Sequence, residues 1–288
     1  MLSMHFNQAA IIAQRMMNLH YSDMNKHLIR ISSGYRINSA ADDPAGLAVS
    51  ERMRSQIYGL EQANKNVLDG ISMFQVADAG LSEALSIFQR IRVLALQAAN
   101  GAITDEDRNL IQYEVTELVS EVSRILTSTE FNSLKLLTSS AGVSQPASLH
   151  IGPNANQTLE INLPDLSDST LNLSSINVSA LQNAESSITS VDSAIRQILS
   201  SRAQIGAKIN RLEHIMNFNS IYKENISAAE SRIRDADIAE EISGFIKSKI
   251  LAEAAQMVFI QANRLQRSLI MTLLEQLNST NRKVKKNF

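Results

Sequence analysis

The feature that most constrains this sequence is a seven-residue apolar repeat that continues unbroken from residue 53 to residue 88. Its members are Met53, Leu60, Val67, Phe74, Leu81 and Phe88. A repeat of seven keeps one seam of a helix facing a partner helix. The pattern from Leu47 to about Asn100 predicts one helix roughly 80 Å long at 1.5 Å per residue. Such a helix is a rod and does not fit a compact globule.

A second row of the helix is less regular, and glycines interrupt the rod. The positions four residues after each member of the apolar repeat are apolar only in alternate heptads: Ile57, Asn64, Ile71, Asp78, Leu85 and Arg92. Gly59, Gly70 and Gly80 each destabilise a helix by about 1 kcal/mol relative to Ala. They are either tolerated defects or places where a neighbouring helix approaches closely, and we expect the close approach.

Other segments predict a partner rod, a return helix and a hairpin. Thr104 and Asp107 resemble a capping box that opens the return helix. Alternating apolar residues on either side of GPNANQ, at 149–151 and 159–163, predict a small β-hairpin. Three-four spacing returns over 188–236. We therefore expect a mainly α fold, a long antiparallel helical coiled-coil bundle with a small β-hairpin element.

Both ends of the chain are amphipathic, and few other residues remain that could cover their apolar faces. The apolar positions of these segments include Phe6, Met16, Leu28, Ile31, Val258, Leu265, Leu269 and Leu273. Isolated helices are marginal in water, so we expect these ends to order only when several copies share them. This pattern is typical of a polymer subunit.

These patterns divide the chain into five parts. Residues 1–33 and 237–288 are the expected terminal helices, and 34–46 connects the first of them to the rod. Residues 47–137 are the N-terminal part of the rod domain, 138–187 hold the hairpin and loops, and 188–236 complete the rod.

Composition and motifs argue against catalysis. Net charge is −2, and there is no Cys. A charge this small gives no reason to expect nucleic acid as a partner. The five histidines form no metal-binding spacing, and we expect the face shared by His20 and His27 to be solvated. Asp42 and Asp43 are better explained as a helix cap beside Pro44 than as an acid/base pair. We expect no enzyme activity, catalytic residue, metal or cofactor. The N-terminus does not resemble a cleaved signal peptide.

Several collinear segments resemble bacterial flagellin. They include ISSGYRINSAADDPAGLAVSERMRSQIYGL at 31–60, QANKNVLDGISMFQVADAGL at 62–81, QRIRVLALQAANG at 89–101 and RIRDADIAEE at 232–241. The resemblance implies paired terminal helices that line the inner tube of a filament, surrounded by a helical bundle. Only about 50 residues separate the rods, so the chain resembles a core-only flagellin without outer variable domains.

The resemblance also implies which residues make contacts. The family uses the surface matching Arg90, Arg92, Leu94 and Glu114 for contacts between subunits, and Toll-like receptor 5 binds residues matching Arg90, Leu94 and Glu114. The alternative is a solvated helix surface with a salt-bridge partner. In the terminal helices, the expected subunit interface comprises Leu28, Ile31, Val258, Leu265, Leu269 and Leu273.

The implied partners are further copies of the chain and other flagellins, an export chaperone, and filament-cap and hook-junction proteins. Sheath proteins are further candidates. We expect a secreted protein of the flagellar filament, which is external, sheathed or periplasmic. The C-terminal segment ANRLQRSLIMTLLEQ, with Arg264 and Arg267 and no Pro, and the basic tail depart from the family pattern. The alternatives are a hook–filament junction protein and a non-flagellar coiled-coil assembly protein.

Overall fold

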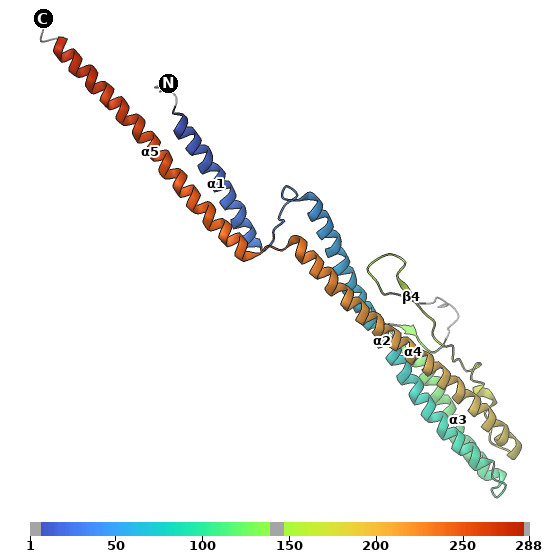
Figure 1. The fold of residues 1–288 in the computed structure, drawn as a ribbon. Helices are drawn as coiled ribbons and strands as arrows, with labels where there is room; N and C mark the ends of the chain where they lie inside the picture. The colour runs from blue at the N-terminus through green and yellow to red at the C-terminus, as the bar shows by residue number, and fades with distance from the viewer. Residues whose placement is uncertain (1–6, 139–146, 285–288) are drawn as a thin grey trace. The chain divides into compact units, whose positions relative to one another are not determined.

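The computed structural model describes residues 7–138 and 147–284, without the side chains of Ala147, Leu269 and residues 277–284. Phe6 lies outside the described residues. The elements are α1 (Gln8–Ser33), α2 (Pro44–Ala98), α3 (Asp105–Ser128), β1 (Glu130–Phe131), β2 (Leu134–Lys135), β3 (Ala147–His150), β4 (Thr158–Ile161), a 3₁₀ turn η1 (Leu173–Ser175), α4 (Leu181–Arg234) and α5 (Ile238–Val284) (Figure 1). They form two compact units. Met1–Arg54 and Ser227–Phe288 make the terminal unit, and Ser55–Ile226 make the bundle unit.

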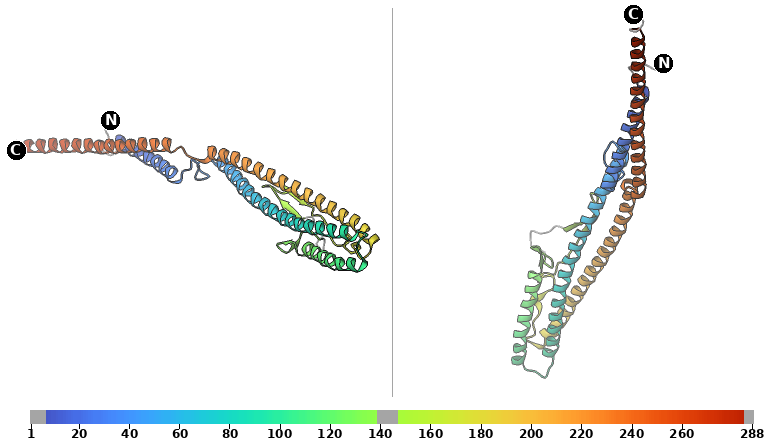
Figure 2. Two further views of the ribbon diagram at one scale, coloured as in Figure 1. Left: turned by 90° about the horizontal axis from the view of Figure 1, so that it is seen from below. Right: turned by 90° about the vertical axis from the view of Figure 1, so that its left-hand side faces the viewer.

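In the bundle unit, α2 and α4 pair as an antiparallel coiled coil. Ion pairs join Glu61 to Lys223 and Arg92 to Asp192, so residue numbers rise along one helix as they fall along the other. Five members of the heptad repeat have exposures of 0%: Leu60, Val67, Phe74, Leu81 and Phe88. Helix α3 folds back beside α2 and adds Val115, Val122 and Leu126 to the same core (Figure 2). The expected fold class is confirmed.

The polar companion positions of the repeat face α4. Asp78 accepts from Arg202 Nε at 2.8 Å, Asn64 Nδ2 donates to Ser220 Oγ at 3.4 Å, and Arg92 bonds Asp192. The seam is therefore apolar along one row, whereas the companion row alternates apolar residues such as the buried Ile71 with polar residues that bond α4.

The predicted hairpin is present, and it explains two of the glycines. Strands β3 and β4 pair antiparallel with Leu149 opposite Leu159. A Cβ on Gly59 would lie 3.0 Å from Pro153 Cα, and one on Gly70 would lie 2.6 Å from Leu149 Cδ2. At Gly80 the nearest atom to such a Cβ is Thr129 Oγ1 at 2.6 Å, in the residue after α3. The expectation that a neighbouring helix makes the close approach is therefore wrong at Gly59 and Gly80, and at Gly70 the hairpin comes closer than Leu212 of α4, which lies at 3.4 Å.

Local capping sets the helix starts as expected. Thr104 and Asp107 exchange hydrogen bonds in a capping box at the start of α3. Asp43 Oδ1 accepts from Gly46 N at 2.9 Å at the start of α2. These contacts satisfy amides that have no partner within the helix.

In the terminal unit, α1 lies antiparallel on α5. Asn7 Nδ2 donates to the carbonyl oxygen of Ala262 at 3.1 Å, while His27 meets Glu241 at the other end of the pair. Residues 34–36 and 234–236 bridge through their backbones, with Ala236 N donating to Gly34 O at 2.9 Å. Asn7, at the start of α1, lies beside Asn263, with Asn7 Nδ2 3.5 Å from Asn263 Oδ1. Figure 1 shows that α5 continues beyond the start of α1.

Candidate assembly surface

The interface between α1 and α5 buries small and polar side chains most deeply. Its most buried members are Ala10, Ala13, Glu241, Ser248 and Ala252. Partly buried residues continue the same faces at three-four spacing: Met17, His20, Met24, His27, Phe245, Ala255, Phe259 and Ala262. Alanine and serine bury little apolar area, and burial contributes roughly 25 cal/mol per Å². This seam alone holds the two helices weakly.

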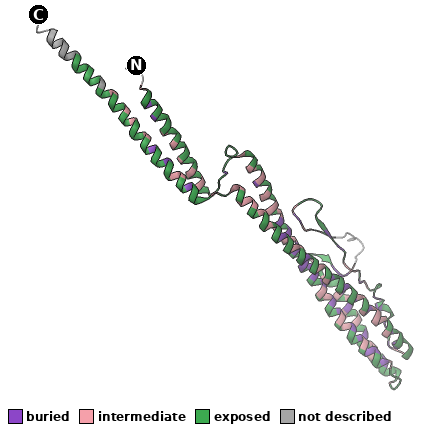
Figure 3. Cartoon of the chain, in the orientation of Figure 1, coloured by how far each residue is buried: buried purple, intermediate pink, exposed green. Residues whose placement is uncertain are grey.

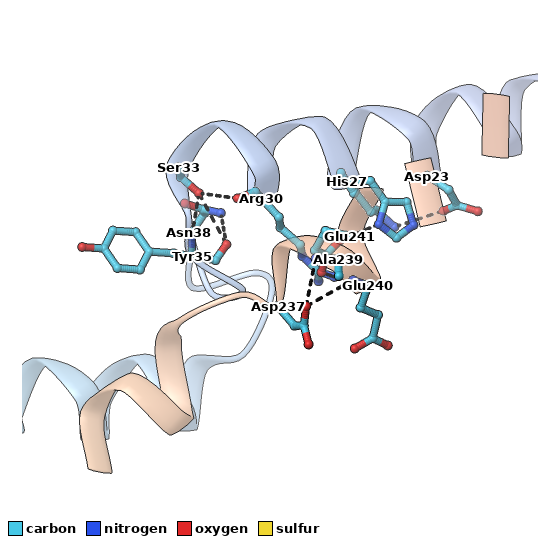
Figure 4. A network of polar contacts seen from close by, with 11 residues as sticks. Asp23, His27, Arg30, Ser33, Tyr35, Asn38, Asp237, Ala239, Glu240 and Glu241 are labelled. Carbon is cyan, nitrogen blue, oxygen red and sulfur yellow. Dashed lines mark hydrogen bonds and ion pairs between the residues drawn. The ribbon is translucent and has the colours of Figure 1, made fainter. Parts of the chain in front are cut away.

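One polar cluster stands at the end of the seam nearest the connecting segments (Figure 4). Glu241 Oε2 lies 2.5 Å from His27 Nδ1, and Glu241 Oε1 accepts from Arg30 Nη1 at 3.2 Å. The Glu241 side chain is only 9% exposed. Opposite His27 stands Gly244, where a Cβ would lie 2.5 Å from the imidazole Cε1. The expectation of a solvated His27 is wrong, because Glu241 and Gly244 enclose its ring.

Many large apolar side chains of the terminal unit lie outside the seam. The outward apolar face comprises Ile11, Ile12, Met16, Leu19, Leu28 and Ile29 of α1, and Ile242, Ile246, Ile250, Leu251, Met257, Val258, Ile260, Leu265, Ile270, Met271, Leu273 and Leu274 of α5, all exposed. In Figure 3 exposed residues dominate both terminal helices, whereas buried residues concentrate in the bundle unit. Exposed large apolar side chains in this number on two paired helices are typical of an interaction site.

The expected interface residues of the terminal helices fall mostly on this face. Leu28, Val258, Leu265 and Leu273 are exposed, and Leu265 has 60% of its surface accessible. Ile31 is partly buried. The side chain of Leu269 lies outside the described part of the structure.

In the bundle unit, Arg90 and Glu114 form an exposed ion pair between α2 and α3. Arg90 donates to Glu114 Oε1 from Nε at 3.0 Å and from Nη2 at 2.7 Å. Both side chains are about half exposed. The salt-bridge partner that the alternative reading expected is Glu114 itself.

Arg92 points to the other side of α2 and bonds α4. Its Nε donates to Asp192 Oδ1 at 2.6 Å. The hydrogen bond and the charge of Asp192 raise the pKa of the Arg92 guanidinium above its usual value. Arg90 and Arg92 therefore lie on separate surfaces.

Leu94 is a core residue. Its exposure is 3%, and it packs in the main hydrophobic cluster of the bundle unit. In this structure it supports the helix from within and does not share the surface of Arg90 and Glu114.

The sequence did not predict the cluster around Glu241. It also did not predict that the exposed apolar residues of α1 and α5 lie outside the seam between these helices. The one available signal was the heptad spacing of His20 and His27. It could not show that the partner of His27 lies 214 residues away.

Among the described residues, no group of three or more His, Cys, Asp or Glu side chains is arranged to hold a metal ion. No described helix has a segment that is both long and apolar enough to span a membrane.

Comparison with known proteins assigns the family. Residues 5–141 match the family described as bacterial flagellin N-terminal helical region, and residues 188–274 match bacterial flagellin C-terminal helical region. Flagellin FlaB1 of Treponema pallidum is 39% identical over 280 residues, which cover 93% of this chain and 98% of that protein. Flagellin of Halalkalibacterium halodurans is 39% identical over 269 residues, with the same two shares.

Similarity to a solved structure extends to the fold. A protein described as a flagellar hook-associated protein, from Vibrio parahaemolyticus, has a TM-score of 0.57 at 15% identity and covers 67% of this chain and 100% of its own. At that identity the likeness shows the fold alone and does not favour a junction protein. The alignments cover 98% of each of these two relatives, which leaves no length for large outer domains. They therefore have a short middle segment, as this chain does. The chain belongs to the bacterial flagellin family, as a core-only, non-enzymatic structural subunit of the flagellar filament.

Proposed function

We propose that the outward apolar face of the terminal unit is the surface through which copies of this chain join into the filament, with residues 1–33 and 237–288 forming its inner core. One observation carries this proposal. The pair α1–α5 buries alanine, serine and Glu241 most deeply in its own seam, and it leaves most of its described isoleucines, leucines and valines exposed.

Energetics favour burial of that face between copies. Full burial of one Leu, Ile or Val side chain contributes roughly 1.5–3 kcal/mol. Two long helices joined by a thin seam cannot cover these residues themselves. Neighbouring copies with the same face can cover them, as a helical homopolymer requires.

A second contact is proposed on the bundle unit. Arg90 and Glu114 present a paired, half-exposed polar surface that joins α2 to α3. We assign this surface to contacts between neighbouring subunits and, secondarily, to Toll-like receptor 5. Arg92 and Leu94 act there indirectly, because Arg92 ties α2 to α4 and Leu94 packs beneath the helix.

Further partners follow from assembly outside the cell. An export chaperone, a filament cap and hook-junction proteins would each meet the same terminal helices before or during polymerisation. Electron microscopy of cells that lack this chain would show whether the missing filament is external, sheathed or periplasmic.

Hydrogen exchange tests the main proposal directly. Amides of α1 and of α5 up to Gln276 should exchange quickly in the soluble chain and slowly after seeded polymerisation. Amides of the α2–α4 core, already protected, serve as the internal reference. Unchanged exchange in α1 and α5 within a sedimented polymer would place the interface elsewhere.

A further inference from the structure

We propose that Glu241 sets the register of α1 on α5, by pairing with His27 and Arg30 and rejecting the alternative placed one heptad away. This role concerns pairing within one chain and holds whether or not the outward face is the filament interface. The observation behind it is a carboxylate, 9% exposed, that reaches two basic side chains across the seam at 2.5 and 3.2 Å.

The most buried members of the seam other than Glu241 carry no charge: Ala10, Ala13, Ser248 and Ala252. A slide of seven residues also changes side-chain size, since Met17 and His20 stand seven residues after Ala10 and Ala13, but only at Glu241 does it exchange the charge of a partner. In coiled coils a single buried polar position commonly selects one register among similar ones. Glu241 occupies such a position.

The sequence of α1 makes the first alternative unfavourable. His20 and Asp23 precede His27 and Arg30 by seven residues each. A slide that brings His20 to the place of His27 therefore brings Asp23 to the place of Arg30. Gly244 would still accommodate the imidazole, so the space at this site does not exclude the slide. Two carboxylates would then face each other, and like charges at close range repel.

The opposite slide removes both partners. It would place residues 34 and 37 opposite Glu241, beyond Ser33, where α1 ends. Glu241 would lose both of its charged hydrogen bonds, and Arg30 would face the region of Ser248. A buried charge without a partner is strongly unfavourable.

The backbone hydrogen bonds beside the cluster are a second contact that would hold α1 in the same register. Backbone bonds join Gly34 to Ala236 and Arg36 to Arg234 next to the cluster. The connecting segment from Gly34 to Asp43 is long enough to follow a slide of about 10 Å, since an extended chain spans roughly 3.3 Å per residue. The bridge would have to open, so an experiment must separate it from Glu241.

Cross-linking at the far end of the pair separates them. Asn7 Nδ2 lies 3.5 Å from Asn263 Oδ1, about 30 Å along the helix from Glu241. The chain has no Cys, so introduced pairs report alone. Asn7→Cys with Asn263→Cys reports the observed register, and Asn7→Cys with Gln256→Cys reports the slide that brings His20 to Glu241. A short bifunctional thiol reagent joins each pair. Diluting the labelled chain among cysteine-free copies limits the product to cross-links within one chain.

The parent chain should cross-link in the first pair only. Glu241→Ala should lower the ratio of first to second product by about tenfold or more, the effect expected from losing charged hydrogen bonds. Exposed Glu240→Ala is the matched control and should leave the ratio unchanged. Exchanging the charges, with Asp23→Arg and Arg30→Asp together, should make the second product dominant.

The soluble and sedimented fractions are measured separately. The variant with Asp23→Arg and Arg30→Asp keeps the amino-acid composition of α1. If Glu241→Ala does not polymerise, the cross-links of this double variant decide whether Glu241 sets the register. If both variants give only the first product, the backbone bridge sets the register and Glu241 does not. If the parent chain cross-links in one register but forms no sedimentable polymer, the proposed filament interface is contradicted. The role of Glu241 in setting the register is then unaffected.

Discussion

Arg92 Nε donates to Asp192 Oδ1 at 2.6 Å and so joins α2 to α4, whereas Arg90, two residues earlier, pairs with Glu114 of α3. A helix turns about 200° over two residues, so the two guanidinium groups leave α2 on nearly opposite sides. Arg92 occupies a seam position of the coiled coil, and Arg90 occupies its outer surface. One arginine therefore stabilises the bundle, and the other is available for contacts with other molecules.

Charge reversal should distinguish these two arginines. Arg92→Glu places a second carboxylate against Asp192 and should lower the melting temperature of the soluble chain. Arg90→Glu lies on the surface, where substitutions usually change folding by about 0.5 kcal/mol or less. We expect Arg90→Glu to weaken seeded polymerisation more than melting. The combination of Arg92→Asp with Asp192→Arg should restore the melting temperature. Normal assembly of Arg90→Glu would show that the lateral contact lies elsewhere.

Two glycines inside long helices should respond in opposite ways to alanine. Nothing lies within 4 Å of a Cβ built on Gly206 of α4, so Gly206→Ala should stabilise the bundle unit by up to about 1 kcal/mol through helix propensity. At Gly59 the same Cβ would lie 3.0 Å from Pro153 Cα. Backbone moves less readily than a side-chain tip, so Gly59→Ala should lose most of that gain or destabilise the hairpin. Denaturant unfolding of both variants measures the difference, and equal stabilisation would mean that the hairpin loop yields freely.

The start of α3 should be sensitive to acid. Hydrogen bonds from the side chain and backbone of Thr104 lower the pKa of Asp107 below its usual value. A carboxyl group with a lowered folded pKa stabilises the fold above its unfolded pKa, and that contribution disappears as pH falls through the folded value. Asp107→Asn should therefore melt below the parent at neutral pH, and the two should converge as pH falls from about 5 to about 2. Glu106→Gln, in the same turn, is the control. A gap between Asp107→Asn and the parent that persists in strong acid would rule out this titration as its cause.

The fold of the bundle unit could be predicted largely from periodicity, because its information is local. The heptad from Leu60 to Phe88 predicts a buried row, and the alternation around GPNANQ predicts a hairpin. The contacts of Gly59 could not be predicted, because a glycine shows that space is needed but not which segment fills it. In the terminal unit the apolar residues indicated an interface. They did not show that alanine and serine form the intramolecular seam, since small residues carry little hydrophobic signal.

Limited proteolysis should reveal the difference between the two units. The α2–α4 core buries its apolar row completely, whereas α1 and α5 share a thin seam, and segments with few buried apolar contacts open first. Protease should therefore trim both ends of the soluble chain and leave a fragment of about residues 45–235. Seeded polymer is the control, because assembly should protect the same ends. Equal protection of the whole soluble chain would contradict a terminal unit that needs other copies.

The polymer interface itself is best tested at Leu265 and Leu273, two exposed residues of α5 that follow Asn263, the residue beside Asn7 at the start of α1. Burial between copies would contribute roughly 1.5–3 kcal/mol for each leucine, and a carboxylate in its place would lose water without gaining a partner. Leu265→Asp or Leu273→Asp should therefore block polymerisation. In the soluble chain both positions are already in water, so helicity by circular dichroism and the melting temperature should hardly change. Leu273→Met keeps the apolar contact and should still polymerise. Normal sedimentation of both Asp variants with seeds would exclude this end of α5 from the interface. Unfolding of the soluble chain by either one would instead mean that α5 packs on its own chain there, which would remove the physical reason for assembly through this face.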